Sequence, residues 1–263
     1  MNESDFHPEP VQWGDIGKHQ DDNSIYRGHR CAGWKLETSL ERASERLHDS
    51  LENAVGMEQV LLREFRRRFH HYSSQVPGPT ERLRWLSLMQ HHGAPTRFLD
   101  WTYSVYVAAY FALENAKDDC AIWKINKKWL AEEGKTLFEK ASYSTSIFDS
   151  ERDEDIEKDF QRDVISRPPL SVVVQVNPFQ LDERLSIQKG IFLYPCDLRI
   201  GFEENLRLMP GSLDPKNIQK LVLSHAERPS ALKILHTMNI SRATLFPGLD
   251  GFAQSLKVYH PLL

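Results

Sequence analysis

The chain has 263 residues, of which 40% are hydrophobic and 27% are charged, with a formal net charge of -4 and a pI near 6.3. This length suits one α+β domain and is enough to bury a core without disulfide or metal support. The slightly acidic balance gives no overall attraction to nucleic acid, and no apolar run reaches the length of a membrane span.

Residues 1–23 are polar and contain prolines, so we expect them to form an extended lead-in without a secretory signal. The three cysteines, Cys31, Cys120 and Cys196, are far apart and show neither a C-x-x-C pair nor a zinc-ligand spacing. They are predicted to be reduced and mostly buried. These features predict a cytoplasmic protein that contacts no membrane and needs no metal.

The first predicted elements are a strand and three helices. The stretch "SIYRGHR" (residues 24–30) favours a strand that ends in a turn. Apolar residues recur at helical spacing over residues 37–72, where Gly56 is expected to divide two helices. A third helix is predicted over 81–92 and is expected to stop at Gly93.

The most apolar helix of the chain is predicted over residues 103–115, and strands dominate afterwards. "CAIWKIN", "SVVVQVN", "GIFLY" and "KLVLS" have strand character, and 228–239 is an amphipathic helix. Helices and strands do not alternate regularly. The expected fold class is therefore α+β, with a helix-rich N-terminal half packed on a mostly antiparallel sheet from the C-terminal half, and residues 24–263 forming one domain.

Arg27 is the first candidate functional residue because it stands at the end of a predicted strand. Its guanidinium could hold a phosphate or carboxylate with two hydrogen bonds, and Gly28 would let the backbone approach a ligand closely. The alternative is an arginine that pairs with a neighbouring carboxylate. Asp100 is a residue that could supply it.

The segment "TRFLDWT" allows the same two interpretations. Asp100, Thr102 or Ser104 could cap the following helix, a contribution of about 1 kcal/mol. Alternatively, the N-terminus of that helix would bind an anion. We expect Arg27, Arg97 and Asp100 to line one polar cleft.

Two further patterns have competing interpretations. Adjacent histidines on a helix point about 100° apart, so the pairs at 70–71 and 91–92 do not fit one metal ion. The basic run "LREFRRRFHHY" (residues 62–72) is either a solvated helix face or a nucleic-acid contact. The aromatic residues of helix 103–115 fit a core better than a stacking platform.

The chain closely resembles the FRG domain family, named for an aromatic-Arg-Gly motif that Tyr26, Arg27 and Gly28 carry here. Later elements of the family are similar to Gln188, Gly190 and Phe192 and to residues 245–251, so the resemblance covers about residues 24–252. The family's central block is matched by Gln90, His91, Gly93, Pro95, Thr96, Arg97, Leu99, Asp100, Trp101 and Thr102.

The order of these elements also resembles ADP-ribosyltransferase folds, although Gln-Lys-Gly stands at 188–190 where those folds carry a catalytic glutamate. This resemblance implies an NAD-using transferase or NAD glycohydrolase, with NAD as substrate and a toxin-like or antiviral role. The implied catalytic residues are Arg27, Asp100 and Gln188. The implied binding residues are Tyr26, Arg27, Gly28, His91, His92, Arg97, Thr102 and Tyr110, with Tyr110 stacking on the nicotinamide.

A non-catalytic module that recognises a nucleotide, a nucleic acid or a protein is the alternative. A protein or nucleic acid could also be the acceptor of a transferred group. A hydrolase that uses paired histidines is less well supported, because the spacing fixes no second acid or base.

Overall fold

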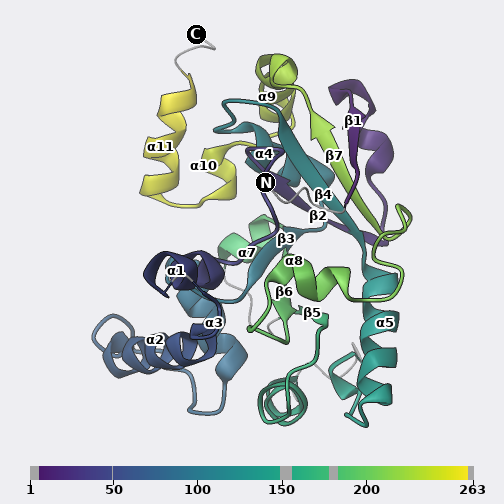
Figure 1. Ribbon diagram of the computed structural model, residues 1–263. Coiled ribbons are helices and arrows are strands. Elements are labelled where there is room, and N and C mark those ends of the chain that lie inside the picture. Colours follow the sequence, from purple (N-terminus) through teal and green to yellow (C-terminus); the bar gives the residue numbers. More distant parts are fainter. Residues whose placement is uncertain (1–5, 49, 149–155, 178–182, 260–263) are drawn as a thin grey trace.

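The computed structural model describes residues 6–48, 50–148, 156–177 and 183–259. Its centre is a seven-stranded sheet in the order β1-β7-β4-β2-β3-β6-β5, in which only β1 and β7 run parallel (Figure 1). This confirms a mixed fold with a mostly antiparallel sheet. The strands are β1 (Pro8–Val11), β2 (Ser24–His29), β3 (Leu99–Thr102), β4 (Cys120–Asn126), β5 (Val173–Val176), β6 (Gly190–Pro195) and β7 (Ile218–Leu223).

The sheet is nearly divided between β2 and β3. Strand β2 pairs with β4 along its whole length, and β3 pairs with β6, but β2 and β3 share one residue pair, Tyr26 with Thr102. Beyond that pair the two strands separate, so residues 27–29 face residues 99–101 without a ladder of hydrogen bonds. We call this opening the split.

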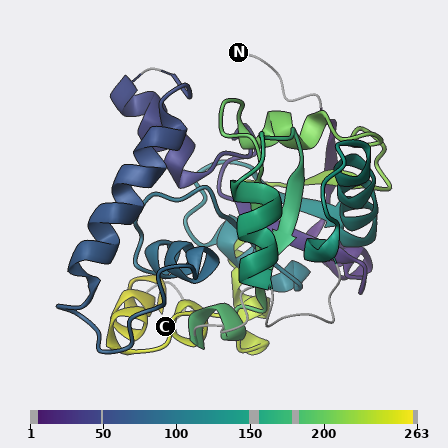
Figure 2. The ribbon, with the colours of Figure 1, turned by 90° about the horizontal axis from the view of Figure 1, so that it is seen from below.

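Helices cover both faces of the sheet (Figures 1 and 2). One apolar core joins α4 and α9 to β2, β4 and β7, and the other joins α2, α3, α5 and α8 to β3, β5 and β6 and to further residues of β2, β4 and β7. The long helices are α1 (Ser39–His48), α2 (Ala54–Phe69), α3 (Arg82–His91), α4 (Val105–Leu113), α5 (Lys127–Lys140), α9 (Arg228–Thr237) and α11 (Leu249–Tyr259). The short ones are η1 (Trp13–His19), η2 (Ser146–Phe148), α6 (Ile156–Phe160), η4 (Gln161–Ile165), α7 (Glu183–Ile187), α8 (Phe202–Arg207), η5 (His225–Glu227) and α10 (Arg242–Leu245).

The prediction that the sheet comes from the C-terminal half is wrong. Strands β1 to β4 all precede residue 127, and β3 lies in the segment expected to be a helix-capping turn. Four residues are too few to show a period, and pairing with β6 stabilises this strand. Ser104 caps α4, accepting a hydrogen bond from the backbone N–H of Val107.

The lead-in is also not a simple extension. Residues 8–11 pair in parallel with β7, and η1 follows with Trp13 and Ile16 buried. These two apolar residues pack into the core around α4, which is why the segment folds against the domain despite its polar composition.

Glycines divide the helices differently from expectation. Gly56 lies inside α2, because α1 ends at His48 and α2 begins at Ala54. A Cβ at Gly56 would meet open space, so the position places no demand on the backbone. Gly93 ends α3 as predicted, with a φ of 77° that side chains rarely adopt.

Candidate functional site

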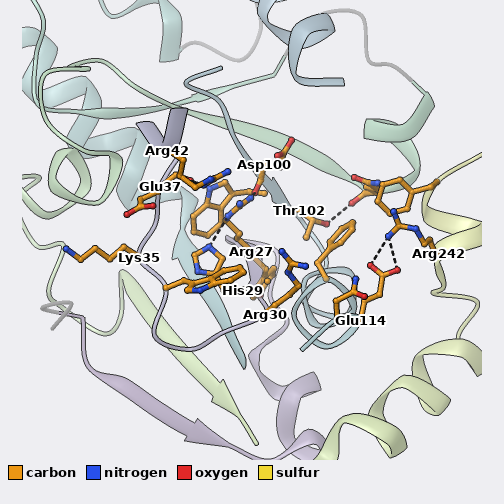
Figure 3. Close-up of a pocket in the computed structure, with 18 of the residues that line it drawn as sticks. Arg27, His29, Arg30, Lys35, Glu37, Arg42, Asp100, Thr102, Glu114 and Arg242 are labelled. Atoms are coloured by element: carbon orange, nitrogen blue, oxygen red, sulfur yellow. Dashed lines mark hydrogen bonds and ion pairs between the residues drawn. The ribbon is translucent and has the colours of Figure 1, made fainter. Parts of the chain in front are cut away.

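A pocket of about 920 Å³ lies at the split. Strand β2 and the loop that follows it form one wall, and β3, α4, α7 and α10 contribute the others (Figure 3). Its volume is at the upper end of the range for small-molecule sites, which is about 300–1,000 Å³. The geometry of the sheet thus makes room for a sizeable ligand.

The lining of this pocket is strongly cationic. Six arginine or lysine side chains face three carboxylates, whereas the chain as a whole is slightly acidic. An excess of positive charge in a concave site raises the local concentration of anions. The basic residues are Arg27, Arg30, Lys35, Arg42, Arg184 and Arg242, and the acidic ones are Glu37, Asp100 and Glu114.

Arg27 spans the split. Its Nη1 donates to the backbone carbonyl of Asp100 at 2.5 Å, and it forms no ion pair with a carboxylate of the described residues. Burial lowers the pKa of Arg27 to about 10, so the guanidinium is a cation at neutral pH. A half-buried cation without a paired anion is a strong attractor for a ligand phosphate or carboxylate.

His29, two residues along β2, adds to this excess of donors. Arg27 Nε lies 3.3 Å from its Nε2, and Trp123 Nε1 lies 3.3 Å from its Nδ1. Burial, assisted by the charge of Arg27, lowers the pKa of His29 to about 3, so the ring is neutral. A neutral imidazole accepts at one nitrogen only, so His29 accepts from Arg27 or from Trp123 but not from both at once.

Asp100 lies on β3 opposite Arg27. Its Oδ2 accepts from Gln90 Nε2 at 2.7 Å, and Gln90 Oε1 accepts from Thr96 Oγ1 at 2.5 Å. The carboxylate is exposed, and these bonds orient it from the side of α3. Asp100 is therefore a fixed acceptor at the pocket rim and does not cap α4.

The opposite end of the pocket contains a buried carboxylate, Glu114. Arg242 Nη1 donates to both its oxygens at 2.9 Å, and Tyr110 donates its hydroxyl to Oε1 at 2.8 Å (Figure 3). The guanidiniums of Arg184 and Arg242 each lie 4.5 Å from the ring centre of Phe246. This end combines positive charge, one carboxylate and aromatic surface.

Several predicted site residues line the pocket, but some serve the fold. Thr102 Oγ1 donates to the carbonyl of Gln188, and Gln188 Nε2 donates to the carbonyl of Leu245, which joins β3, α7 and α10. Tyr26 is buried and donates its hydroxyl to the carbonyl of His19 at 2.6 Å. A Cβ at Gly28 would lie 2.0 Å from the carbonyl oxygen of Ala108 in α4. The close approach at Gly28 is therefore with a helix.

The structure contradicts the expected position of Arg97. Its side chain is buried away from the pocket lining and donates from Nε to Glu58 Oε1 at 2.6 Å, with a second, shorter bond from Nη2. Although burial alone raises the pKa of Glu58, the charges of Arg97 and Arg82 lower it below its ordinary value. Arg97 belongs to a structural ion pair.

Three other residues that were expected at the site do not line the pocket. His91 and His92, at the end of α3, are not among the lining residues. Tyr110 belongs to α4, and its ring is buried in the core. It therefore offers no exposed face on which a ligand ring could stack. Its chain neighbour Phe111 lines the pocket instead, because consecutive helical residues point about 100° apart.

Many lining residues were not singled out from the sequence. Trp34, Lys35, Glu37 and Arg42 lie on the irregular segment after β2 and on α1, and others lie on α7 and α10. An Arg or Lys in a loop has no sequence signature that separates it from solvated charge. Glu114 is the one of these lining residues with a usable sequence signal, because it is a charged residue directly after an uncharged, apolar helix.

The basic face of α2 is partly neutralised by contacts within the structure. Arg67 and Arg68 pair with Glu64 at 3.2 and 2.9 Å. Arg66 lies over the ring of Trp85, with 5.5 Å to the ring centre, and donates to the carbonyl of Pro79. These contacts agree with the solvated-face interpretation.

The described residues carry no group of three or more His, Cys, Asp or Glu side chains arranged for a metal ion. Within the same ranges, none of the helices combines the length and apolar character that crossing a bilayer requires.

Comparison with known proteins gives one family match. Residues 22–120 match the family model of the FRG domain, whereas no curated protein and no solved structure matches the chain. The matched segment contains both sides of the split, including Arg27 and Asp100, while Arg184, Arg242 and Phe246 lie beyond it. Over residues 22–120 the chain is therefore similar to FRG domains.

Proposed function

We propose that the pocket binds a dinucleotide of the NAD type and that this protein cleaves the bond between nicotinamide and ribose. The observation that carries the proposal is Arg27, a half-buried cation in the split that forms no ion pair among the described residues. A diphosphate supplies charged acceptor oxygens for the Arg27 guanidinium, whose one oxygen acceptor among the described residues is a neutral backbone carbonyl.

The size and composition of the pocket suit this ligand class. A dinucleotide is long, doubly anionic at its diphosphate and aromatic at both ends. The pocket has aromatic residues at both ends, Trp34 on one side and Phe111 and Phe246 on the other, with Arg27 between them. Figure 3 shows Lys35 and Arg42 on one side of Arg27, and Glu114 and Arg242 on the other.

The proposed reaction breaks the N-glycosidic bond. The bonding electrons leave with the nicotinamide nitrogen, which becomes neutral, and positive charge develops on the ribose at C1′. The oxygen of water, or a nucleophilic atom of an acceptor, then bonds to C1′ and releases a proton. Carboxylates near the ribose stabilise the transition state because its charge is positive.

Each pocket residue then has a role consistent with its position. Arg27 holds the diphosphate, and Asp100 lies across the split, where its carboxylate faces the developing charge. Gln188 is directed to the ribose hydroxyls, although its amide N–H already donates to Leu245. Glu114 adds a second carboxylate, ion-paired to Arg242.

Two reactions are possible, and they differ in the molecule that accepts the ADP-ribosyl group. With water the protein is an NAD glycohydrolase, and with a protein or nucleic acid it is an ADP-ribosyltransferase. A toxin-like or antiviral effector role is a hypothesis that depends on this activity, since loss of NAD harms a cell.

The test combines NAD binding by calorimetry with detection of released nicotinamide. We expect Arg27→Ala to weaken binding roughly 10- to 150-fold, which is the value of a hydrogen bond to a charged group. Arg27→Lys keeps the charge but loses the fork of donors, so we expect an intermediate loss. The matched control is Arg63→Ala on α2, outside the pocket, which should bind as wild type.

Three outcomes separate the functions. Binding with nicotinamide release supports the proposal. Binding without release, including with protein or nucleic-acid acceptors present, supports the non-catalytic recognition module. No binding of NAD at about 1 mM contradicts the proposal, because that corresponds to only about 4 kcal/mol of affinity.

A further inference from the structure

Trp34 is unusual among the tryptophans of this chain. It lines the pocket and is 46% exposed, whereas none of the other five tryptophans exceeds 9%. Tryptophan has the largest apolar surface of any side chain, and exposing it to water in the free protein is unfavourable. An exposed indole inside a cationic pocket therefore indicates a surface that a ligand covers.

The segment around Trp34 is held in place, so its exposure is a property of the fold. On one side, the backbone N–H of Ala32 donates to the carbonyl of Asp119 at 2.8 Å. On the other side, the backbone N–H of Leu36 donates to Glu203 at 2.8 Å. Trp34 lies between these two anchors and is presented at the rim of the pocket.

The surroundings of the indole indicate what kind of ring it would contact. The guanidinium carbon of Arg30 lies 5.3 Å from the ring centre of Trp34, and His29 packs against the indole edge-on at 6.2 Å. Lys35 and Arg42 line the same end of the pocket. Glu37 is the one lining carboxylate at this end within the part of the chain that the structure describes.

The two ends of the pocket differ in charge, and the two ends of NAD differ as well. The nicotinamide ring of NAD is cationic, and the arginine-rich end around Trp34 repels it. The adenine ring is neutral and stacks well on an indole. The nicotinamide fits better at the other end, where Glu114 lies and two basic residues, Arg184 and Arg242, line the pocket instead of three.

We propose that Trp34 is the stacking platform for the adenine base of the dinucleotide. This inference rests on the proposed function, because it assigns an orientation to the ligand proposed there. It makes Trp34 a determinant of specificity for adenine-bearing ligands.

Tryptophan fluorescence gives the first test on the unmodified protein. The emission of the single exposed indole is distinguishable from that of the five buried ones. We expect NAD and AMP to quench and blue-shift the exposed component, and nicotinamide mononucleotide to leave it nearly unchanged. Trp34→Phe should abolish the exposed component together with its response.

Calorimetric titration of variants gives the second test. We expect Trp34→Ala to weaken binding of NAD and AMP roughly 5- to 150-fold, the usual range for one stacked base. Binding of nicotinamide mononucleotide should change less than about twofold. Trp34→Phe keeps an aromatic face and should retain most of the affinity. The control is Tyr72→Ala, which removes an aromatic that is 85% exposed and outside the pocket.

The outcomes distinguish failure of this inference from failure of the proposed function. If NAD binds wild type but Trp34→Ala binds all three ligands normally, the adenine assignment is wrong and the proposed function stands. If Trp34→Ala weakens all three equally while retaining its circular dichroism spectrum, Trp34 maintains the pocket and the assignment is again wrong. If no ligand binds wild type, both are wrong.

Discussion

Arg27 and Arg97 show how differently this fold treats two arginines. Arg97 is buried and forms two hydrogen bonds to the Glu58 carboxylate, which Arg82 also contacts at 2.8 Å. Arg27 crosses the split, and among the oxygen atoms of the described residues it donates to the carbonyl of Asp100. The charge of Arg97 is neutralised by a carboxylate of the protein, whereas Arg27 can still bind an external anion.

We predict that Glu58→Gln destabilises the protein by about 3–5 kcal/mol. The change leaves the Arg97 charge buried without its counter-ion, which costs far more than the net contribution of the pair. Urea denaturation measures this directly. Glu64→Gln is the matched control, an identical change on the same helix at an ion-paired site with exposed arginines, and should cost less than about 1 kcal/mol. Equal effects at the two sites would contradict the role assigned to burial.

At the scale of elements, one carboxylate connects two helices beside the pocket. Glu41 accepts from the backbone N–H of Thr38, and the Glu41 backbone N–H donates to Thr38 Oγ1 at 3.1 Å, so the two residues form a capping box on α1. The other carboxylate oxygen of Glu41 accepts from the backbone N–H of Phe202 in α8. This joins the segment that carries Lys35 and Glu37 to α8.

The titration of Glu41 predicts a pH effect on stability. Burial raises the pKa of this carboxyl from 4.5 to about 7, which corresponds to about 3 kcal/mol. Between those two pH values the folded state holds a proton that the unfolded state has released. The free energy of unfolding contributed by this group therefore falls as pH rises from about 4.5 to about 7.

Glu41→Gln removes this titration. We expect the stability of the variant relative to wild type to increase between pH 4.5 and pH 7.5, measured by urea denaturation at each pH. A relative stability that stays constant over this interval would mean that Glu41 ionises with an ordinary pKa.

Across the whole molecule, the N-terminal segment is part of the folded domain. The backbone N–H of Trp13 donates to Glu227 at 3.1 Å, and its indole packs edge-on against Tyr106, with 6.3 Å between ring centres. These contacts join η1 to η5 and α4, which are distant in the sequence.

We therefore expect Trp13→Ala to cost about 3–5 kcal/mol in urea denaturation, the usual cost of truncating a buried aromatic. The same change at Trp34, which is exposed, should cost less than about 1 kcal/mol. A small effect at Trp13 would restore the interpretation of residues 1–23 as a lead-in.

Elements with strong local patterns could be predicted from the order of the amino acids alone. The period-two and apolar stretches gave β2, β4, β5, β6 and β7 within a few residues, and helical spacing gave α3, α4 and α9. The match of residues 22–120 to the FRG domain likewise depends on local motifs, which contain Arg27 and Asp100. Periodicity, turn residues and motifs are properties of neighbours along the chain, so they need no knowledge of the fold.

Which of those residues share a pocket depends on contacts between distant segments of the folded chain. The order of strands in the sheet placed Arg27 of β2 within hydrogen-bond distance of the Asp100 carbonyl of β3, and packing placed Arg97 against Glu58, 39 residues away in the sequence. Residues from α7 and α10 completed the site although no local pattern distinguished Arg184 or Arg242 from solvated charge. Contacts between distant segments depend on how the sheet and helices assemble, and no single stretch of sequence specifies that assembly.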